Sequence, residues 1–168
     1  MIFPICAFDA KNAVLCPQCE GKVDSGVLTK ADVDASLTLA KIAKTTMEIE
    51  NFSLYSCNEF EENFNLSLAK NDIMVIRQSR TLYRLLQDNF KQKIWLVEAE
   101  QTDKKFIEDL FFPIKILAIN GVWAEGVQKT KAIISGKWTS KFPIDIKKIM
   151  EIVKNVRNLD IEIVFEDK

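Results

Sequence analysis

The sequence predicts an α+β protein made of two units with the same order of helices and strands, preceded by a short cysteine-rich segment. Hydrophobic residues make up 48% of the 168 residues, which is enough for a packed core and argues against disorder. Helical and strand periodicities alternate along the chain, and the order found in residues 28–99 returns in residues 100–168. Three of the four cysteines lie before residue 20, in a pattern typical of metal sites.

In residues 28–99 the order is helix, strand, strand, helix, helix, strand. Thr29 and Asp32 have the spacing of a capping box, and the apolar residues that follow at helical spacing predict a helix behind it. Alternating apolar and polar residues predict the strands. The expected elements are a helix at 29–47, strands at 52–60 and 63–69, a short apolar run at 72–77, a helix at 80–90 and a strand at 93–98.

Residues 100–168 show the same order in full or shortened form. The expected elements are a helix at 102–110, strands at 114–119 and 127–135, an irregular stretch at 136–143, a helix at 144–156 and a strand at 160–165. Asn120 and Gly121 suit a turn, although Val122 and Trp123 could instead extend the first strand. Each unit is then a three-stranded sheet with helices on one face. We expect Trp95 and Trp123 in the cores.

The chain contains no histidine, which excludes Ser-His-Asp and Cys-His catalysis. It also lacks a Walker A motif, a dinucleotide fingerprint and a nucleophile elbow, so we expect no enzyme, although a small metal-dependent one using Asp or Glu remains a third possibility. There is no signal peptide and no apolar run long enough to span a bilayer, which predicts a cytoplasmic protein that does not contact membranes. Cytoplasmic cysteines are metal ligands or free thiols more often than disulfides.

The cysteine-rich segment pairs a C-x2-D spacing with a C-x2-C spacing. Cys6 precedes Asp9 by the same interval as Cys16 precedes Cys19, and Gly21 follows, as in a zinc knuckle with a tight turn. Zinc accepts three thiolates and one carboxylate, so these residues form a candidate structural zinc site. Cys57 could replace Asp9 as the fourth ligand, and a metal-free loop with buried thiols is the alternative. A redox role is less suited, because this C-x2-C does not follow a strand in a βαβ unit.

The αββααβ order is that of a type II KH domain, and short motifs support it. The stretch from Phe111 through Pro113 to Leu117 resembles the junction between the tandem KH domains of NusA, and the cysteine-bearing start is similar to that of archaeal NusA-like proteins. The resemblance implies a zinc-knuckle-like segment at 1–27 and KH-like domains at 28–99 and 100–168. It also implies a monomeric factor without catalytic activity that binds single-stranded RNA in transcription elongation or termination.

Charge is segregated along a chain whose net charge is −1. Residues 44–72 are mostly acidic, whereas 77–93 and 129–157 are mostly basic, which fits either a polyanion site or ordinary solvated faces. The KH family clamps nucleic acid with a G-x-x-G loop, and neither unit keeps it. Arginine pairs with phosphate and tryptophan stacks on bases, so the resemblance places RNA contacts on the following residues: Arg77, Gln78, Arg80, Gly136, Lys137, Trp138 and Lys141.

The missing glycines also motivate a second hypothesis. Degenerate KH units could act as a protein–protein adaptor bound to RNA polymerase or the ribosome.

Overall fold

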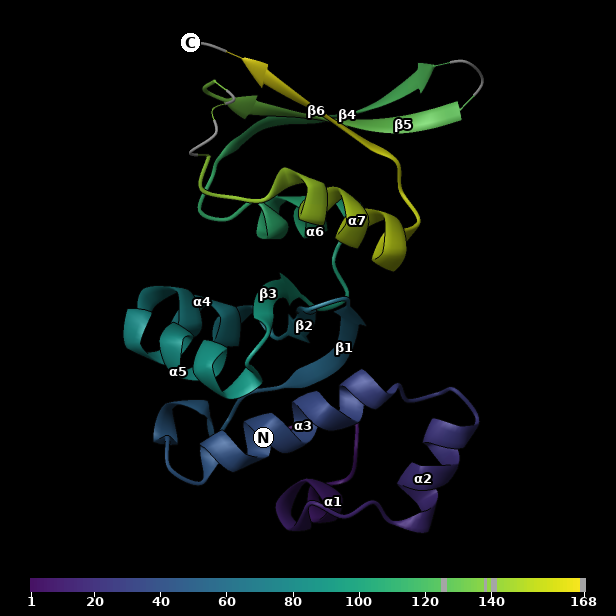
Figure 1. The fold of residues 1–168 in the computed structure, drawn as a ribbon, viewed down its shortest axis with the longest axis vertical. Coiled ribbons are helices and arrows are strands. Elements are labelled where there is room, and N and C mark those ends of the chain that lie inside the picture. The colour runs from purple at the N-terminus through teal and green to yellow at the C-terminus, as the bar shows by residue number, and fades with distance from the viewer. Residues whose placement is uncertain (125–126, 138, 140–141, 167–168) are drawn as a thin grey trace. The chain divides into compact units, whose positions relative to one another are not determined.

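The structure is a computed structural model that describes every residue except 125–126, 138, 140–141 and 167–168 (Figure 1). The chain forms two compact units, Met1–Glu100 and Gln101–Lys168. Each unit combines helices with a three-stranded sheet, so the α+β class that the sequence predicts is confirmed. Among the described residues, no helix is both long and apolar enough to cross a membrane.

The first unit begins with two short helices and continues in the predicted order of elements. The sheet has the strand order β1-β2-β3, with β1 antiparallel to β2 and β2 parallel to β3. A single 3₁₀ turn, η1, separates the third helix from the first strand. The bounds are α1 Ala7–Asn12, α2 Pro17–Asp24, α3 Lys30–Ala43, η1 Met47–Ile49, β1 Leu54–Phe60, β2 Asn63–Leu68, α4 Lys70–Gln78, α5 Arg80–Phe90 and β3 Lys93–Glu98.

Helix α3 starts with the predicted capping box, which also attaches the helix to the sheet. The Thr29 hydroxyl accepts a bond from the Asp32 N–H, and Asp32 Oδ2 accepts from the Thr29 N–H at 2.8 Å. Asp32 Oδ1 accepts a further bond of 2.6 Å from the backbone N–H of Cys57 in β1. Because the Asp32 side chain is buried, one carboxylate both caps α3 and satisfies a main-chain donor of an edge strand.

Helix α3 is buried on two sides, and each side belongs to a different core. One side, with Ala35, Leu39 and Ile42, faces the core of the sheet, which also contains Leu66 and Leu86. The other side contributes Val33 and Ala40 to a smaller cluster that holds the N-terminal segment. The N-terminal members of this smaller cluster are Ile5, Ala10, Cys19 and Leu28. Helix α1 therefore packs on the outer side of α3, and α2 joins the same cluster through Cys19 (Figure 1).

The second unit is a shortened version of the first. Its sheet has the order β4-β5-β6, with β4 antiparallel to β5 and β5 parallel to β6, as in the first unit. One helix, α7, stands between β5 and β6, and no second helix occurs there in the described residues. The bounds are α6 Asp103–Leu110, β4 Ile116–Ala124, β5 Val127–Ser135, α7 Ile146–Arg157 and β6 Ile161–Glu166.

Two local predictions in the second unit are wrong. Asn120 and Gly121 do not form a turn but lie inside β4, where they pair with Lys131 and Thr130. The alternative, that Val122 and Trp123 extend the first strand, is confirmed. The pairing of β5 with β6 begins only at Thr130, so β4 and β5 extend past the third strand as a two-stranded ribbon. Trp123 lies on this extension, beyond the part of β5 that pairs with β6, and is 73% exposed.

Trp95, in contrast, is buried as predicted. Its indole Nε1 donates a bond of 3.1 Å to Asn63 Oδ1, which satisfies the one polar atom of the ring.

Replacing Asp32 should destabilise the first unit more than replacing any exposed carboxylate of the same helix. The Asp32→Ala change removes the capping interaction and leaves the buried Cys57 N–H without an acceptor. We expect a loss of about 2–4 kcal/mol in the free energy of unfolding. Urea titration should show a lower midpoint with an unchanged m value. Asp34→Ala, on the exposed side of α3, is the matched control, and equal effects of the two changes would contradict the assignment.

Candidate functional site

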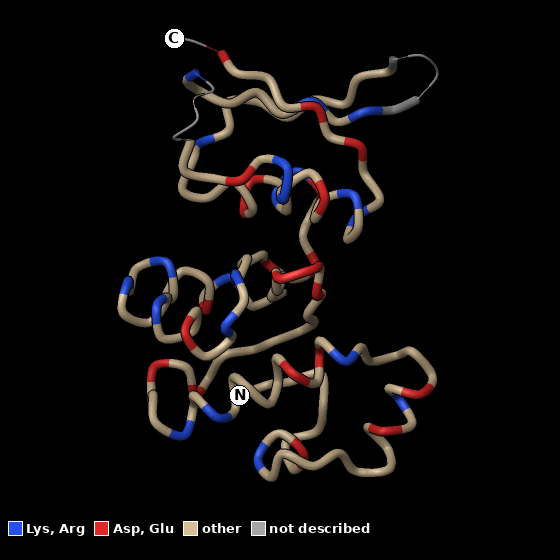
Figure 2. The backbone as a smooth tube through the Cα atoms, in the orientation of Figure 1, with Lys and Arg blue, Asp and Glu red and all other residues tan. Residues whose placement is uncertain are grey.

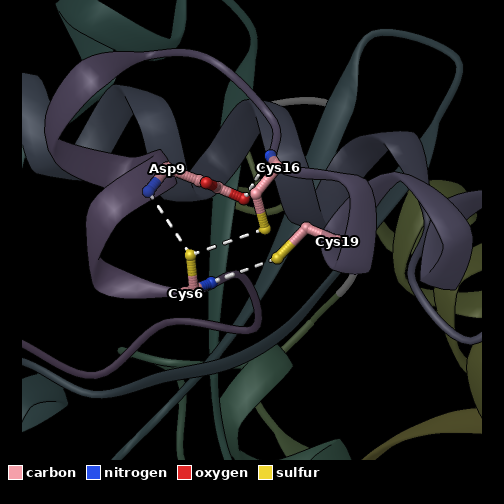
Figure 3. Close-up of side chains that lie close together, drawn as sticks. All are labelled: Cys6, Asp9, Cys16 and Cys19. Carbon is pink, nitrogen blue, oxygen red and sulfur yellow. Dashed lines mark hydrogen bonds between the residues drawn. The ribbon is translucent and has the colours of Figure 1, made fainter.

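The first candidate site is formed by the starts of two helices. Cys6 is the N-cap of α1 and Asp9 its third helical residue, whereas Cys16 is the N-cap of α2 and Cys19 its third helical residue. The first turn of a helix brings the N-cap and third side chains to the same side, so each helix presents two donor groups together. Figure 3 shows the four side chains converging from these two helix starts.

The donor atoms of the four residues lie within 4.8 Å of one another. The two sulfurs of Cys6 and Cys16 are 4.0 Å apart. Main-chain donors also reach the sulfurs, because the Asp9 N–H donates to Cys6 Sγ and the Cys6 N–H to Cys19 Sγ, each at 3.4 Å (Figure 3). N–H groups that point at these sulfurs could stabilise them as thiolates once a metal ion is bound.

Asp9 is fully buried, and only one of its carboxylate oxygens has a hydrogen-bond partner among the described residues. Oδ2 accepts a bond of 3.0 Å from the Cys16 N–H, whereas Oδ1 has none. The hydrogen bond from the Cys16 N–H, with smaller contributions from the nearby thiols, lowers the pKa of Asp9 to about 2 against the opposing effect of burial. An ionised carboxylate oxygen buried without a partner is costly, and a bound cation would satisfy it.

The pKa of the buried Cys19 thiol is also shifted by the groups around it. The N–H of Cys6 lowers its pKa, but the Asp9 carboxylate, burial and the two neighbouring thiols together raise the pKa to about 12. A divalent cation bound at this position would instead lower the pKa of Cys19, because it stabilises thiolate and carboxylate together.

These four residues can hold a metal ion. A tetrahedral ion with metal–sulfur bonds of about 2.3 Å separates its sulfur ligands by about 3.8 Å, close to the Cys6–Cys16 distance. Since no two donor atoms are more than 4.8 Å apart, metal binding would require them to approach one another by about 1 Å. The orphaned Asp9 oxygen and the donor set of three sulfurs and one carboxylate both fit such an ion.

Cys57, the alternative fourth ligand, does not belong to this cluster. It is buried in the sheet core of the first unit, and burial raises the pKa of its thiol. Asp9 is therefore the fourth donor. The predicted tight turn is also wrong, because Cys16 to Cys19 form the first turn of α2 and Gly21 lies within that helix without a positive φ.

The RNA contacts predicted in the first unit lie where two helices meet. Arg77 is in the last turn of α4 and Gln78 ends that helix, whereas Arg80 begins α5. A single residue, Ser79, joins the helices and caps α5 by accepting a bond from the Leu82 N–H at 3.2 Å. Arg77 is half-buried and donates to the Leu96 carbonyl at 3.5 Å, whereas Gln78 and Arg80 are exposed. No open loop exists here.

In the second unit, Gly136 and Lys137 follow the end of β5. Gly136 has a φ of +111°, a conformation that favours glycine, and its N–H donates to the Glu166 carbonyl at 3.0 Å. Lys137 is exposed and has an interaction partner. Trp138 and Lys141 lie outside the described residues. Of the four contacts predicted in this unit, the structure therefore places two, Gly136 and Lys137, directly after β5.

Helices α4 and α5 are basic, whereas the rest of the first unit is acidic. From Lys70 to Lys93 there are six Lys or Arg against two Asp, whereas the rest of the first unit has five Lys against 12 Asp or Glu. Figure 2 shows basic segments on both helices. We call Lys70, Arg77, Arg80, Arg84 and Lys91 the basic helical surface; all except Arg77 are exposed. The basic stretch that begins at residue 77 is evident in the sequence, and the structure adds Lys70, at the start of α4, to the same surface.

No protein-family model matches the chain, and no curated protein matches its sequence. Among solved structures, the fold is similar to one described as "Crystal structure of APE1850", with 16% sequence identity and a TM-score of 0.46. The match covers 68% of this chain and 87% of that chain. What the protein does therefore has to be inferred from its own residues.

The four thiols should differ in their reactivity in the native, metal-free protein. Cys6 is exposed and receives an N–H bond at its sulfur, so it should react first with a maleimide at pH 7.5. Cys57 is buried and its pKa is raised, so it should react only on unfolding. Mass spectrometry of partly labelled protein gives the order. Early labelling of Cys57 would contradict the described packing of β1.

Proposed function

We propose that the protein is a non-catalytic RNA-binding factor made of two KH-like units, with its N-terminal segment held by a structural zinc ion. The observation that carries the RNA-binding part is the basic helical surface within an otherwise acidic first unit. Such segregation attracts a polyanion locally even though the net charge of the whole chain is −1.

The contacts would be made by arginine side chains instead of by a glycine loop. Arg80 and Arg84 are one turn apart on α5 and both exposed, so they can engage successive phosphates of a single strand. The α4–α5 junction contains no glycine, so such binding would have to occur without close approach of the main chain to the phosphates. The order α3-β1-β2-α4-α5-β3 supports the KH-like assignment of the first unit.

Zinc is the metal that best suits the N-terminal cluster. Three thiolates and one carboxylate match its preference for sulfur with nitrogen or oxygen donors, and four protein ligands leave no open position for a substrate. The segment before α3 has only a small apolar cluster of its own. Metal binding would therefore supply the stability that this cluster is too small to provide.

The setting that we propose is transcription elongation or termination, from the resemblance to NusA-like proteins. The alternative is an adaptor that binds RNA polymerase or the ribosome through protein contacts. The exposed Trp123 on the extension of β4 favours it, since a large exposed aromatic side chain is frequent at protein interfaces.

Removing two arginines of the basic helical surface should weaken RNA binding and reduce its salt dependence. For a mixed-sequence 12-nucleotide single-stranded RNA, Arg80→Ala with Arg84→Ala should lower affinity roughly tenfold in fluorescence anisotropy. The slope of log K against log salt concentration should become shallower by about 1.4, that is, about 0.7 for each phosphate that the protein no longer neutralises.

Lys22→Ala with Lys41→Ala is the matched control, because it removes two exposed cations of the first unit outside this surface. The control should keep the affinity and the slope of the unmodified chain. If the unmodified chain shows no binding at 50 mM salt, the RNA-binding proposal fails and the adaptor hypothesis stands.

Purified without chelator, the protein should carry about one zinc ion per chain, measured by elemental analysis. Asp9→Ala and Cys16→Ser should each lose most of this zinc, because each removes one of four ligands. Cys57→Ala should keep it while lowering the melting temperature, since it creates a small cavity in the core.

Cobalt substitution adds an independent measurement, because thiolate-to-cobalt absorption reports sulfur ligation. Zinc content that depends on Cys57 and not on Asp9 would show that the described cluster is not the metal site.

A further inference from the structure

A groove runs along one side of α7 in the second unit, between this helix and β6. Its walls carry Ile146 and Met150 from α7 and Ile161, Ile163 and Phe165 from β6. Ile146 and Ile161 are buried at its base, whereas Ile163 and Phe165 are half-buried and Met150 is 40% exposed. The groove is therefore an apolar strip bordered by charged side chains.

Comparison of the two units shows what this position can accommodate. In the first unit, α4 packs against α5 and β3, and it buries Ile73 and Ile76 in the sheet core. The counterparts of α5 and β3 in the second unit are α7 and β6, the two elements that line the groove. Since the described residues between β5 and α7 form no helix, the second unit presents the surface that α4 covers in the first.

The connecting segment covers one end of this surface. Phe142 packs edge-on against Phe165 with ring centroids 5.3 Å apart, and Ile144 is buried beside the start of α7. The lining residues of α7 extend from Ile146 to Asn155, about 14 Å along the helix axis. Counted in the same way, the nine residues of α4 span about 12 Å, so the groove is long enough for such a helix.

We infer that this groove binds an amphipathic helix of a partner protein, about nine residues long, with two apolar side chains three positions apart. The charges at the groove favour this occupant over nucleic acid. Three Lys and three Asp or Glu line it, and Lys154 pairs with Asp160 at 2.8 Å. A polyanion gains no net attraction from such a balanced border, whereas a helix of mixed charge can pair with both signs.

Exposed Lys147, near the start of α7, and Lys129, at the start of β5, border the groove. A partner helix of mixed charge, such as the α4 sequence with Lys70, Asp72 and Arg77, can offer an acidic side chain to these lysines. The inference concerns the second unit alone and does not depend on RNA binding by the first.

The test uses a peptide of residues 69–79, the segment that contains α4, as the probe. Methyl-labelled methionine in the full chain reports its binding by NMR, because Met150 is the only methionine of the second unit. We expect a saturable shift of the Met150 methyl signal with peptide up to about 1 mM, weak because so short a helix is marginal in water. The same peptide with Ile73→Asp and Ile76→Asp should cause no shift.

Met1, Met47 and Met74 belong to the first unit and serve as internal controls. No shift of Met150, or a shift of Met74 without Met150, would overturn the inference, the second because the peptide would then displace α4. A Met150 shift on raising protein concentration without peptide would identify a second copy as the occupant and overturn it as well. A Met150 shift with the 12-nucleotide RNA in place of the peptide would assign the groove to nucleic acid.

Discussion

Burial of α3 on two sides is the constraint on which the first unit depends. The helix has to present apolar residues both to the sheet and to the N-terminal segment, and it has to start where both can be reached. Asp32 fixes that start, since its two carboxylate oxygens join the cap of α3 to the main chain of β1. A carboxylate buried at this point is tolerated because it accepts three hydrogen bonds within the fold.

The N-terminal segment is held in place by different interactions from the rest of the unit. Its apolar cluster against α3 is small, and its other concentrated feature is the set of donors at the starts of α1 and α2. Main-chain N–H groups at these helix starts donate to Cys6 Sγ, Cys19 Sγ and the ionised Asp9 carboxylate. Local helix geometry thus assembles the four potential ligands, and the apolar cluster shared with α3 holds the two helix starts together.

The two units share an order of elements but expose different surfaces, because one helix distinguishes them. In the first unit, α4 fills the space beside α5 and β3 and brings basic residues to the surface. In the second, the described residues between β5 and α7 form no helix, and an apolar groove with balanced charge remains. The two units therefore present different surfaces beside equivalent pairs of elements, α5 with β3 and α7 with β6.

The sequence by itself determined the features that arise between residues close along the chain. The order of helices and strands, the Thr29–Asp32 capping box and the C-x2-D and C-x2-C pairs all follow from local spacing. Tertiary structure decided what depends on distant segments: that Cys57 belongs to a core and not to the metal ligands, that Asn120 lies within a strand, and that Trp123 is exposed. The reason is physical, since burial and strand length are set by which segments pack together, and local periodicity does not specify those partners.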